Sequence, residues 1–458
     1  MKKVFLLVAC CLLLVIGSYS QTVSGRLQKA FTVFEKDEQL KHAISSLYVI
    51  DAKTGQVVFD KNSQIGLAPA STQKVITSVT AFELLGKDYR YKTEFGITEQ
   101  HGKTNLFIKP SGDPALGSWR WEQTNEETLL SNFKKQIASK KISGITINTR
   151  GWLQHSIPDG WIWQDVGNYY GAASGLINWR ENQYDVVLKS GNTIGDVVEI
   201  VETKPRLYGY NFLSLVSSAK EGTGDNAYIY LPVGQSSIII KGTIPVKQNS
   251  FKISGAFPDP EKQFIATLST TLKENFMDTL SHYIGYTDSV NESYFQSLYT
   301  HYSPSLDSII YWFNKKSINL YGEALIKTFA YEKQGFGSTD SGVAIVKKFW
   351  KDKGLYEDEL NIYDGSGLSP LNRVTTHAQV EILKYAKSMD WFPYFLKSLP
   401  DYNGMAMKSG TISDVKGFCG YHKSKEGKEY IFSFLVNNYT GKSSQLVGKM
   451  YKVLDELK

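Results

Sequence analysis

Each end of the chain has a predicted amphipathic helix next to predicted strands, and this arrangement limits the fold more than any other feature of the sequence. Near the start, Leu27, Phe31 and Phe34 recur on one helical face, and a strand hairpin follows. Near the end, three strands come before a second amphipathic helix, which closes the chain. The strand-like segments are 47–50, 56–59, 406–411, 417–422 and 430–437. Because each apolar helical face must be buried, we expect both ends to pack on one sheet, as one α/β domain.

The middle of the chain has a different character, which indicates an insertion. Over residues 89–291, strand-like segments dominate, with helical patterns at 128–140 and 264–274. A chain of 458 residues is long enough for two or three domains. The expected units are 21–88 plus 292–458 for the terminal domain, 89–185 plus 259–291 for one inserted domain, and 186–258 for a second domain nested within it.

The first twenty residues have the pattern of an export signal peptide. Two lysines come before the apolar run Val4–Ile16, and small residues end the segment at Ser20. The run is too short to be a good membrane span. We therefore expect cleavage after residue 20, export to the periplasm or cell envelope, and at most peripheral membrane contact. A lipid anchor at Cys10 is less favoured, because the apolar run continues well past that residue.

Composition excludes several other classes of protein. Beyond the signal peptide, Cys419 is the only cysteine in the sequence, so no intramolecular disulfide is possible. The formal net charge of +6 includes no basic block, so we expect no nucleic-acid partner. The seven histidines are scattered without metal-ligand spacing, so we expect neither a metal nor a cofactor.

A candidate nucleophile lies where a loop turns into a helix. Pro69 cannot extend a helix backwards, and apolar residues from Val75 onward recur at helical spacing until Gly86. This spacing predicts Ser71 in the first helical turn, with Lys74 on the same face. A serine hydroxyl needs a base to take its proton, and a neutral lysine amine can be that base.

The lysine must be neutral for this role. At an ordinary pKa of about 10.4, a neutral lysine at pH 7 costs roughly 4–5 kcal/mol. Burial and a nearby second cation both lower the pKa of a lysine. The Ser-x-x-Lys pattern also occurs at Ser131 and Ser217, where a capping serine and a solvated lysine explain it. The pattern alone therefore does not select Ser71.

Two later clusters supply further polar groups. Ser317-Ile318-Asn319 lies at a break between two predicted helices, where side chains can point into a cleft. Lys408-Ser409-Gly410-Thr411 lies on a predicted strand, where Lys408 supplies the second cation and Gly410 lets a substrate backbone lie close.

In this order, the three clusters resemble the three motifs of penicillin-recognising serine enzymes. Lys74 and Ser317 are 243 positions apart, a far longer gap than compact β-lactamases allow. The gap is similar to that of class C low-molecular-mass penicillin-binding proteins, the D-alanyl-D-alanine carboxypeptidase/endopeptidase family. Further stretches agree with this resemblance, which extends from about residue 40 to the end: 111–114, 160–165, 242–245, 317–323 and 364–369.

The resemblance implies a fold, an activity and partners. The expected fold is α/β (α+β), a penicillin-binding or β-lactamase-like serine transpeptidase domain with a large, mainly β insertion forming one or two extra domains. The expected enzyme is a serine-type D-Ala-D-Ala carboxypeptidase that acts on peptidoglycan stem peptides, with endopeptidase cleavage of cross-links as a second activity. β-Lactam antibiotics would be covalent inhibitors.

The resemblance also implies catalytic roles. Ser71 would attack the carbonyl of the terminal D-Ala–D-Ala bond, and Lys74 would accept its proton. Ser317 would relay a proton to the departing D-alanine, while Asn319 would hold the substrate amide. The backbone N–H groups of Ser71 and Thr411 would form the oxyanion hole.

Substrate-binding roles follow from the same resemblance. Lys408 would keep the catalytic lysine neutral and attract the terminal carboxylate, which the Ser409 and Thr411 hydroxyls could bind, with Gly410 close to the substrate backbone. Asp165 resembles part of a pocket for the amine-bearing third residue of the stem peptide. A surface acid beside two tryptophans is the alternative interpretation.

The sequence departs from the family pattern at four positions. Ile318 stands where Asp is frequent, Ser409 where Thr is commoner, Ser111 where Gly is usual, and Pro370 where a basic residue is frequent. None removes a catalytic group. Two alternative functions remain open at this point: a β-lactamase-like or esterase hydrolase, and a non-catalytic peptidoglycan-binding protein.

Overall fold

The computed structural model describes residues 22–458 except 101, 154–156, 233–236, 277–282 and 289–293. The predicted signal peptide at 1–20, with Cys10, lies outside the described residues. Among the helices that the structure describes, none combines the length and the apolar character needed to cross a bilayer.

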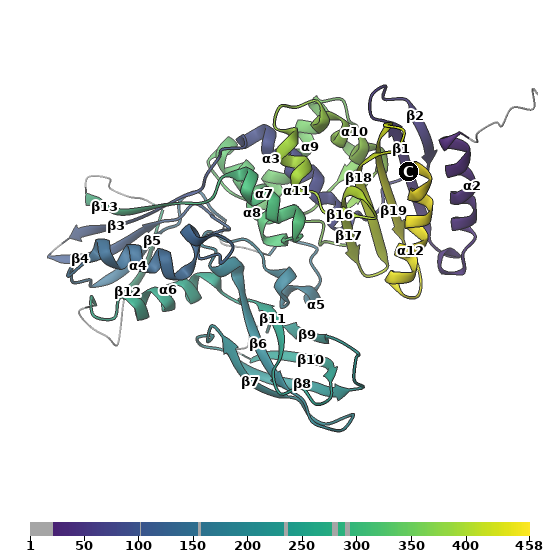
Figure 1. Ribbon diagram of the computed structural model, residues 1–458. Helices are drawn as coiled ribbons and strands as arrows, with labels where there is room; N and C mark the ends of the chain where they lie inside the picture. The colour runs from purple at the N-terminus through teal and green to yellow at the C-terminus, as the bar shows by residue number, and fades with distance from the viewer. Residues whose placement is uncertain (1–21, 101, 154–156, 233–236, 277–282, 289–293) are drawn as a thin grey trace, which may run out of the picture.

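Both ends of the chain contribute strands to one sheet (Figure 1). The sheet has the order β16-β17-β18-β19-β1-β2, and β1 pairs antiparallel with both β19 and β2. Its strands are β1 Ile44–Asp51, β2 Val57–Lys61, β16 Asp401–Tyr402, β17 Met405–Ile412, β18 Val415–Lys423 and β19 Glu429–Asn437. The predicted hairpin and the three predicted C-terminal strands are therefore confirmed.

The first and last α-helices of the described chain cover one face of this sheet. Helix α2 (Val23–Glu35) and helix α12 (Ser443–Leu454) lie side by side in Figure 1. Phe31 and Phe34 pack on Phe434 of the sheet, and Met450 of α12 belongs to the same apolar cluster. The apolar faces found in the sequence thus pack against the sheet, as predicted.

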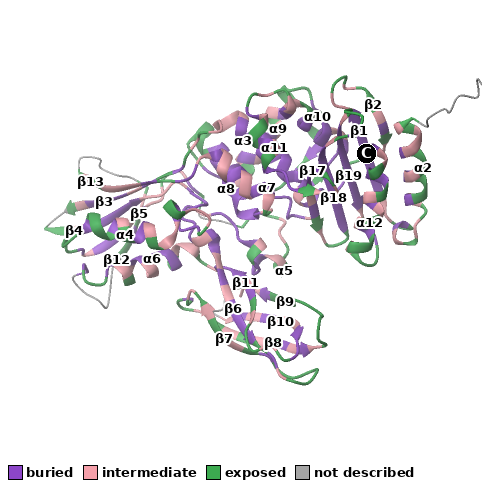
Figure 2. Ribbon diagram, viewed as in Figure 1, coloured by how far each residue is buried: buried purple, intermediate pink, exposed green. Residues whose placement is uncertain are grey.

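The other face of the sheet carries a group of helices. These are α3 Lys74–Leu85, α7 Leu306–Lys315, α8 Asn319–Gln334, α9 Thr339–Asp352, α10 Thr376–Lys387 and α11 Phe392–Ser398. Their shared core includes Val79, Ile310 and Leu325, all fully buried. Figure 2 shows buried residues throughout the sheet and the adjoining helices, so the site described below is built on a continuous buried core. A short pair of strands, β14 (Leu360–Asn361) and β15 (Arg373–Val374), borders this group.

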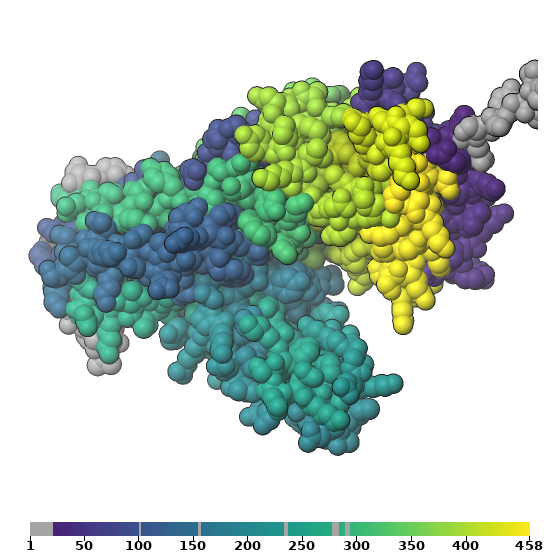
Figure 3. All heavy atoms as spheres, viewed as in Figure 1, coloured from purple at the N-terminus to yellow at the C-terminus, as the bar shows by residue number. Residues whose placement is uncertain are grey.

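The inserted region has its own core and its own sheets. Helices α4 (Glu126–Ile137) and α6 (Pro260–Thr271) pack beside a sheet of order β12-β5-β4-β3-β13, where Phe95 lies between Phe133 and Phe264. Two three-stranded sheets, β8-β10-β9 and β11-β6-β7, form the lower lobe of Figures 1 and 3. The strands are β3 Lys92–Gln100, β4 Lys103–Lys109, β5 Gly144–Asn148, β6 Gln183–Lys189, β7 Glu199–Lys204, β8 Asn211–Ala219, β9 Asn226–Tyr230, β10 Ser237–Pro245, β11 Phe251–Ala256, β12 Tyr283–Thr287 and β13 Phe295–Tyr302.

The strand pairing indicates where the inserted region ends. Strand β13 pairs antiparallel with β3 along residues 295–302, so the five-stranded sheet continues beyond residue 291. Residues 183–256 make the two small sheets between the parts of this larger unit. We propose that the inserted region runs to about residue 302, with the small sheets as the nested domain.

Candidate active site

Ser71 lies in a tight turn that leads into helix α3. Residues Ala70–Gln73 form a 3₁₀ turn, and the α-helix begins at Lys74, three residues later than the sequence suggests. The turn is tight because both the backbone N–H and the hydroxyl of Thr72 donate to the carbonyl of Pro69. A 3₁₀ turn at the start of an α-helix is common. Gly86 ends the helix, as predicted.

The amine of Lys74 contacts three oxygen atoms. Its Nζ lies 3.0 Å from Ser71 Oγ, 2.6 Å from Asn319 Oδ1 and 2.7 Å from the carbonyl oxygen of Ser366. A neutral amine has two N–H donors and one lone pair. The amide and carbonyl oxygens can only accept, so they take the two N–H groups. The lone pair is then left for the Ser71 hydroxyl, which is the arrangement that a general base requires.

The surroundings of Lys74 favour this neutral form. Its side chain has no exposed surface, and this burial lowers its pKa well below 10.5, with the nearby Lys408 adding to the effect. The carboxyl groups of Asp364 and Glu323 act in the opposite direction but do not cancel it.

The second and third clusters meet at Lys408. Its Nζ donates to Ser317 Oγ at 3.0 Å and to the carbonyl of Ser409 at 2.8 Å. Burial lowers the pKa of Lys408 to about 7. Ser317 has φ 56°, a left-handed conformation that costs a non-glycine residue energy and is found at functional sites. This strained turn between α7 and α8 directs the Ser317 hydroxyl toward the lysine.

Strand β17 passes very close to the turn that holds Ser71. A Cβ atom at Gly410 would lie 2.6 Å from the carbonyl oxygen of Pro69 and 2.9 Å from the backbone nitrogen of Ser71. Both contacts are with backbone, so no side chain can make room. Glycine at this position therefore allows Thr411 to lie beside Ser71 at the edge of the sheet.

A pocket of about 420 Å³ opens over these groups. Of the candidate residues, Ser71, Ser317, Asn319, Thr411 and Asp165 line it. Lys74 and Lys408 lie buried behind it, and Ser409 meets Lys408 through its carbonyl. The other lining residues are Ile162, Gln164, Tyr169, Tyr170, Tyr228, Lys316, Leu368, Pro370, Ile412 and Ser413. The inserted region thus contributes one wall.

Asp165 is placed on that wall by helix α5 (Trp163–Val166). Tyr170 donates its hydroxyl to Asp165 Oδ1 at 3.3 Å, and the backbone carbonyl of Tyr170 accepts from Asn319 Nδ2 at 2.7 Å. Burial raises the pKa of the Asp165 carboxyl. A single residue of the inserted region therefore contacts both the carboxylate and the polar cluster around Ser71.

Sequence reasoning assigned no role to the acids beneath the site. Glu323 accepts hydrogen bonds from the backbone N–H groups of Gly365 and Ser366, and so fixes the carbonyl that holds Lys74. Asp364 accepts from Trp161 Nε1 at 2.9 Å and from other donors of its own loop. Both acids lie in stretches that carry the family resemblance, and this resemblance was the sequence signal that could have pointed to a role for them.

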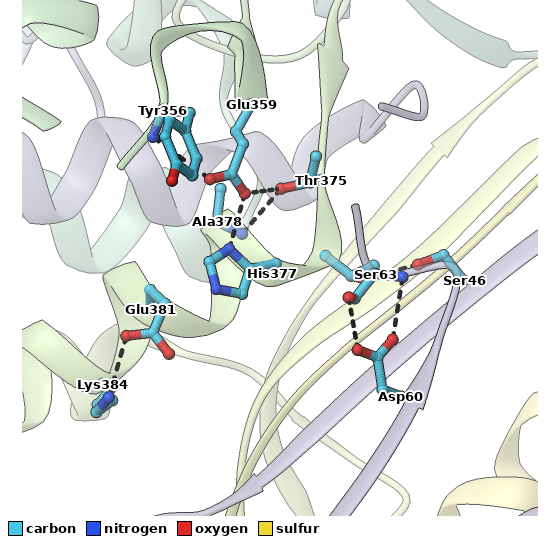
Figure 4. Close-up of polar contacts among 11 residues, drawn as sticks. Ser46, Asp60, Ser63, Tyr356, Glu359, Thr375, His377, Ala378, Glu381 and Lys384 are labelled. Atoms are coloured by element: carbon cyan, nitrogen blue, oxygen red, sulfur yellow. Dashed lines mark hydrogen bonds and ion pairs between the residues drawn. The ribbon is translucent and has the colours of Figure 1, made fainter. Parts of the chain in front are cut away.

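A second polar cluster lies away from the pocket (Figure 4). Glu359 Oε2 accepts from Thr375 Oγ1 at 2.7 Å and lies 2.8 Å from His377 Nδ1. These two contacts tie the start of α10 to the residues just before β14. Figure 4 also shows Ser63, whose hydroxyl donates to Asp60 Oδ2 at 2.9 Å. Within the described part of the chain, no three His, Cys, Asp or Glu side chains group closely enough to hold a metal.

Two of the other Ser-x-x-Lys sequences, those at Ser131 and Ser217, lie in the inserted region. Ser131 is exposed on helix α4, and Ser217 lies on strand β8. The tertiary structure therefore separates them from Lys408 and Ser317, whereas it brings Ser71 to the same pocket.

Comparisons with known proteins agree with this arrangement. The model of the D-Ala-D-Ala carboxypeptidase 3 (S13) family matches residues 27–401. A D-alanyl-D-alanine carboxypeptidase of Actinomadura sp. (strain R39) is 25% identical over 441 residues, 89% of this chain and 80% of the relative. The D-alanyl-D-alanine carboxypeptidase DacB of Haemophilus influenzae is 24% identical over 411 residues, 84% of this chain and 83% of that protein.

Solved structures share the fold. Penicillin-binding protein 4 (DacB) from Haemophilus influenzae superposes with a TM-score of 0.78 at 20% identity, covering 94% of this chain and 98% of that chain. The same protein complexed with a novel β-lactam gives a TM-score of 0.72 at 19% identity. The predicted penicillin-binding fold is therefore confirmed.

Proposed function

This chain belongs to the D-Ala-D-Ala carboxypeptidase 3 (S13) family, and we propose that Ser71 is the nucleophile with which it cleaves peptidoglycan stem peptides. The enzyme is a serine-type D-Ala-D-Ala carboxypeptidase. The observation that carries the assignment of Ser71 is its 3.0 Å contact with the buried amine of Lys74, at the floor of a pocket large enough for a peptide end.

Acylation begins with proton transfer from Ser71 to Lys74. The serine oxygen forms a bond to the carbonyl carbon of the penultimate D-alanine, and the proton moves to the lysine amine. Negative charge develops on the carbonyl oxygen, and the backbone N–H groups of Ser71 and Thr411 stabilise it. The close approach of β17 to the turn at Ser71 supports this pairing of donors.

Collapse of the tetrahedral intermediate breaks the peptide bond. The leaving amine needs a proton, and Ser317 relays to it the proton that Lys74 took from Ser71, which returns Lys74 to its neutral form. Lys408 donates to Ser317 Oγ, so the Ser317 hydroxyl proton is left to point at the leaving amine. D-Alanine departs, and the acyl group stays on Ser71. Water then attacks the ester with Lys74 as the base, which releases the shortened peptide and restores the serine.

Asn319 and Asp165 bind the substrate in this proposal. The Asn319 side chain holds the substrate amide, and its contact with Lys74 links substrate binding to the base. Asp165 faces the pocket and binds the amine of the third stem residue, a role that its position on the wall supports. Lys408, Ser409 and Thr411 bind the terminal carboxylate. Endopeptidase cleavage of cross-links is a second activity of the same site, because a cross-link has the same D-alanyl carbonyl.

Two further proposals concern partners and location. β-Lactam antibiotics acylate Ser71 as covalent inhibitors, as supported by the β-lactam complex of the Haemophilus influenzae protein. The enzyme acts in the periplasm or cell envelope after removal of residues 1–20, which the export pattern of that segment supports.

Labelling with a fluorescent penicillin tests the proposal directly. We expect one penicillin per chain, seen as an increase of intact mass, with the label on the proteolytic peptide that contains Ser71. The same preparation should release D-alanine from a pentapeptide, measured by mass spectrometry. Rapid penicillin turnover without D-alanine release would indicate a β-lactamase-like hydrolase instead. Peptide binding without either reaction would indicate a non-catalytic wall-binding protein.

The pH dependence of kcat/KM is expected to depend on Lys408. Activity should rise as Lys74 loses its proton, well below its ordinary pKa of 10.5, and fall as Lys408, with a pKa of about 7, loses its charge. In a Lys408→Met variant the like charge is gone, so the pKa of Lys74 rises. The rising limb should then move to higher pH and the falling limb should disappear.

The comparison needs pH profiles of the wild type, Lys408→Met and a control, Lys423→Met, which changes an exposed lysine of the same sheet. The control should keep the wild-type profile. A Lys408→Met profile with both limbs in place would contradict the role given to Lys408.

A further inference from the structure

A third buried lysine lies directly behind the pocket, and sequence reasoning passed over it. Lys416 on strand β18 is the cross-strand partner of Thr411 on β17. Its Nζ donates to Thr411 Oγ1 at 2.7 Å, and the residue is only 9% exposed. Because Thr411 lines the pocket, only the Thr411 hydroxyl separates the amine of Lys416 from the pocket.

Lys416 has no anionic partner in the protein. Among the residues that the structure describes, no carboxylate lies within 4.0 Å of its amine, although many other Lys, Arg and His side chains do lie that close to a carboxylate. The ring of Phe418 also lies near it, with its centroid 5.0 Å from the amine. A buried cation without a counter-ion is costly, so such a residue indicates an anion that arrives from outside.

The hydrogen bond from Lys416 also decides what the Thr411 hydroxyl can do. A hydroxyl has one proton and two lone pairs, and an ammonium group can only donate. The lysine therefore occupies a lone pair of Thr411 Oγ1, and the hydroxyl proton must point elsewhere. Thr411 is exposed toward the pocket, so its proton is free to point at a ligand there. Thr411 becomes a donor with a positive charge behind it.

The neighbouring lysine does not duplicate this arrangement. Lys408 already donates to Ser317 Oγ and to the carbonyl of Ser409, both of which are neutral acceptors. Lys416 donates instead to Thr411, at the other end of the segment 408–411. The two cations therefore act on different groups along one strand.

We propose that Lys416 is a positioning residue that orients the Thr411 hydroxyl and supplies positive charge for the carboxylate at the C-terminal end of the substrate. The inference rests on the proposed function of the site. In this proposal, Lys416 and Thr411 act together and make the enzyme selective for peptides that end in a free carboxylate.

The test compares two substrates that differ only in this carboxylate. One pentapeptide ends in free D-Ala–D-Ala, and its partner ends in D-Ala–D-Ala amide. For the Lys416→Met variant, we expect kcat/KM for the free acid to fall by a factor of about 10 to 100, mainly through KM, while kcat/KM for the amide changes little. Lys416→Gln, which is also neutral, serves the same purpose if the methionine variant does not fold.

A double-mutant comparison separates this role from a structural one. Lys416→Met and Thr411→Val should each lower the free-acid preference, and the double variant should lower it no further than the stronger single variant. Lys423→Met, on the same strand but exposed, is the control and should keep the wild-type preference.

Two outcomes would overturn the inference. Equal losses on the free acid and the amide would show that Lys416 only supports the sheet, and an unchanged preference would show that it has no role in carboxylate binding. Either result leaves the proposed function intact as long as the wild type releases D-alanine. A wild type that releases none would refute the proposed function instead.

Discussion

Replacing Ser71 with alanine is expected to lower kcat for D-alanine release by a factor on the order of 10⁶, and to abolish covalent labelling by penicillin. The variant lacks the oxygen that forms the acyl bond. The Ser317 hydroxyl lines the same pocket but accepts from Lys408, whereas Ser71 contacts the base Lys74. Ser71 is half-buried and contributes one side-chain hydrogen bond, to Lys74, so the Tm should change little. The measurements are D-alanine release by mass spectrometry and thermal unfolding.

The matched control for this variant is Ser131→Ala. Ser131 begins the same Ser-x-x-Lys pattern but is exposed on α4 of the inserted region. Wild-type activity and labelling are expected for it. Penicillin labelling of a folded Ser71→Ala variant would refute the assignment of the nucleophile.

Replacing Lys74 with methionine should have the second largest effect, a loss of about 10³- to 10⁴-fold in kcat/KM. Methionine has nearly the length of lysine and suits a side chain with no exposed surface, but it cannot accept a proton. Asn319 and the carbonyl of Ser366 lose their donor, so some destabilisation should accompany the loss. Kinetics with a D-Ala–D-Ala peptide and thermal unfolding separate the two effects.

Two comparisons make the result decisive. Lys134→Met, in the exposed Ser131 pattern, should leave activity unchanged. The rate of acylation by penicillin should fall together with peptide cleavage in Lys74→Met, because both reactions need the serine proton removed. If Lys74→Met loses peptide cleavage but keeps fast acylation, Lys74 is not the base.

Much of the fold was predictable because helix and strand periodicity is local. The apolar face of Leu27, Phe31 and Phe34 needed only their spacing, and the structure buries all three against the sheet. The end of α3 at Gly86 was predictable for the same reason. The 3₁₀ turn at Ser71 was not predictable in this way. The turn lies in close contact with Gly410 of β17, which is more than 300 residues away in the sequence.

The residues of the candidate site likewise fall into those that the sequence could predict and those that depend on the tertiary structure. Residue type and order suggested Ser71 and Lys74, because a nucleophile and its base must be particular side chains. The carbonyl of Ser366 carries no such signal, since every residue has a carbonyl. Lys416 resembles any lysine of an alternating strand, and only the cross-strand register with Thr411 gives it a position at the pocket.

The placement of β1 between β19 and β2 has a consequence for how the site is assembled. Its hydrogen-bonding neighbour β19, together with β17 and β18, comes from a part of the chain more than 300 residues after Ser71. The nucleophile therefore gains Lys408 as a neighbour only when these distant parts of the chain have folded into one sheet. A fragment that ends before β17 would keep Ser71 but lack Lys408, and we expect it to be inactive.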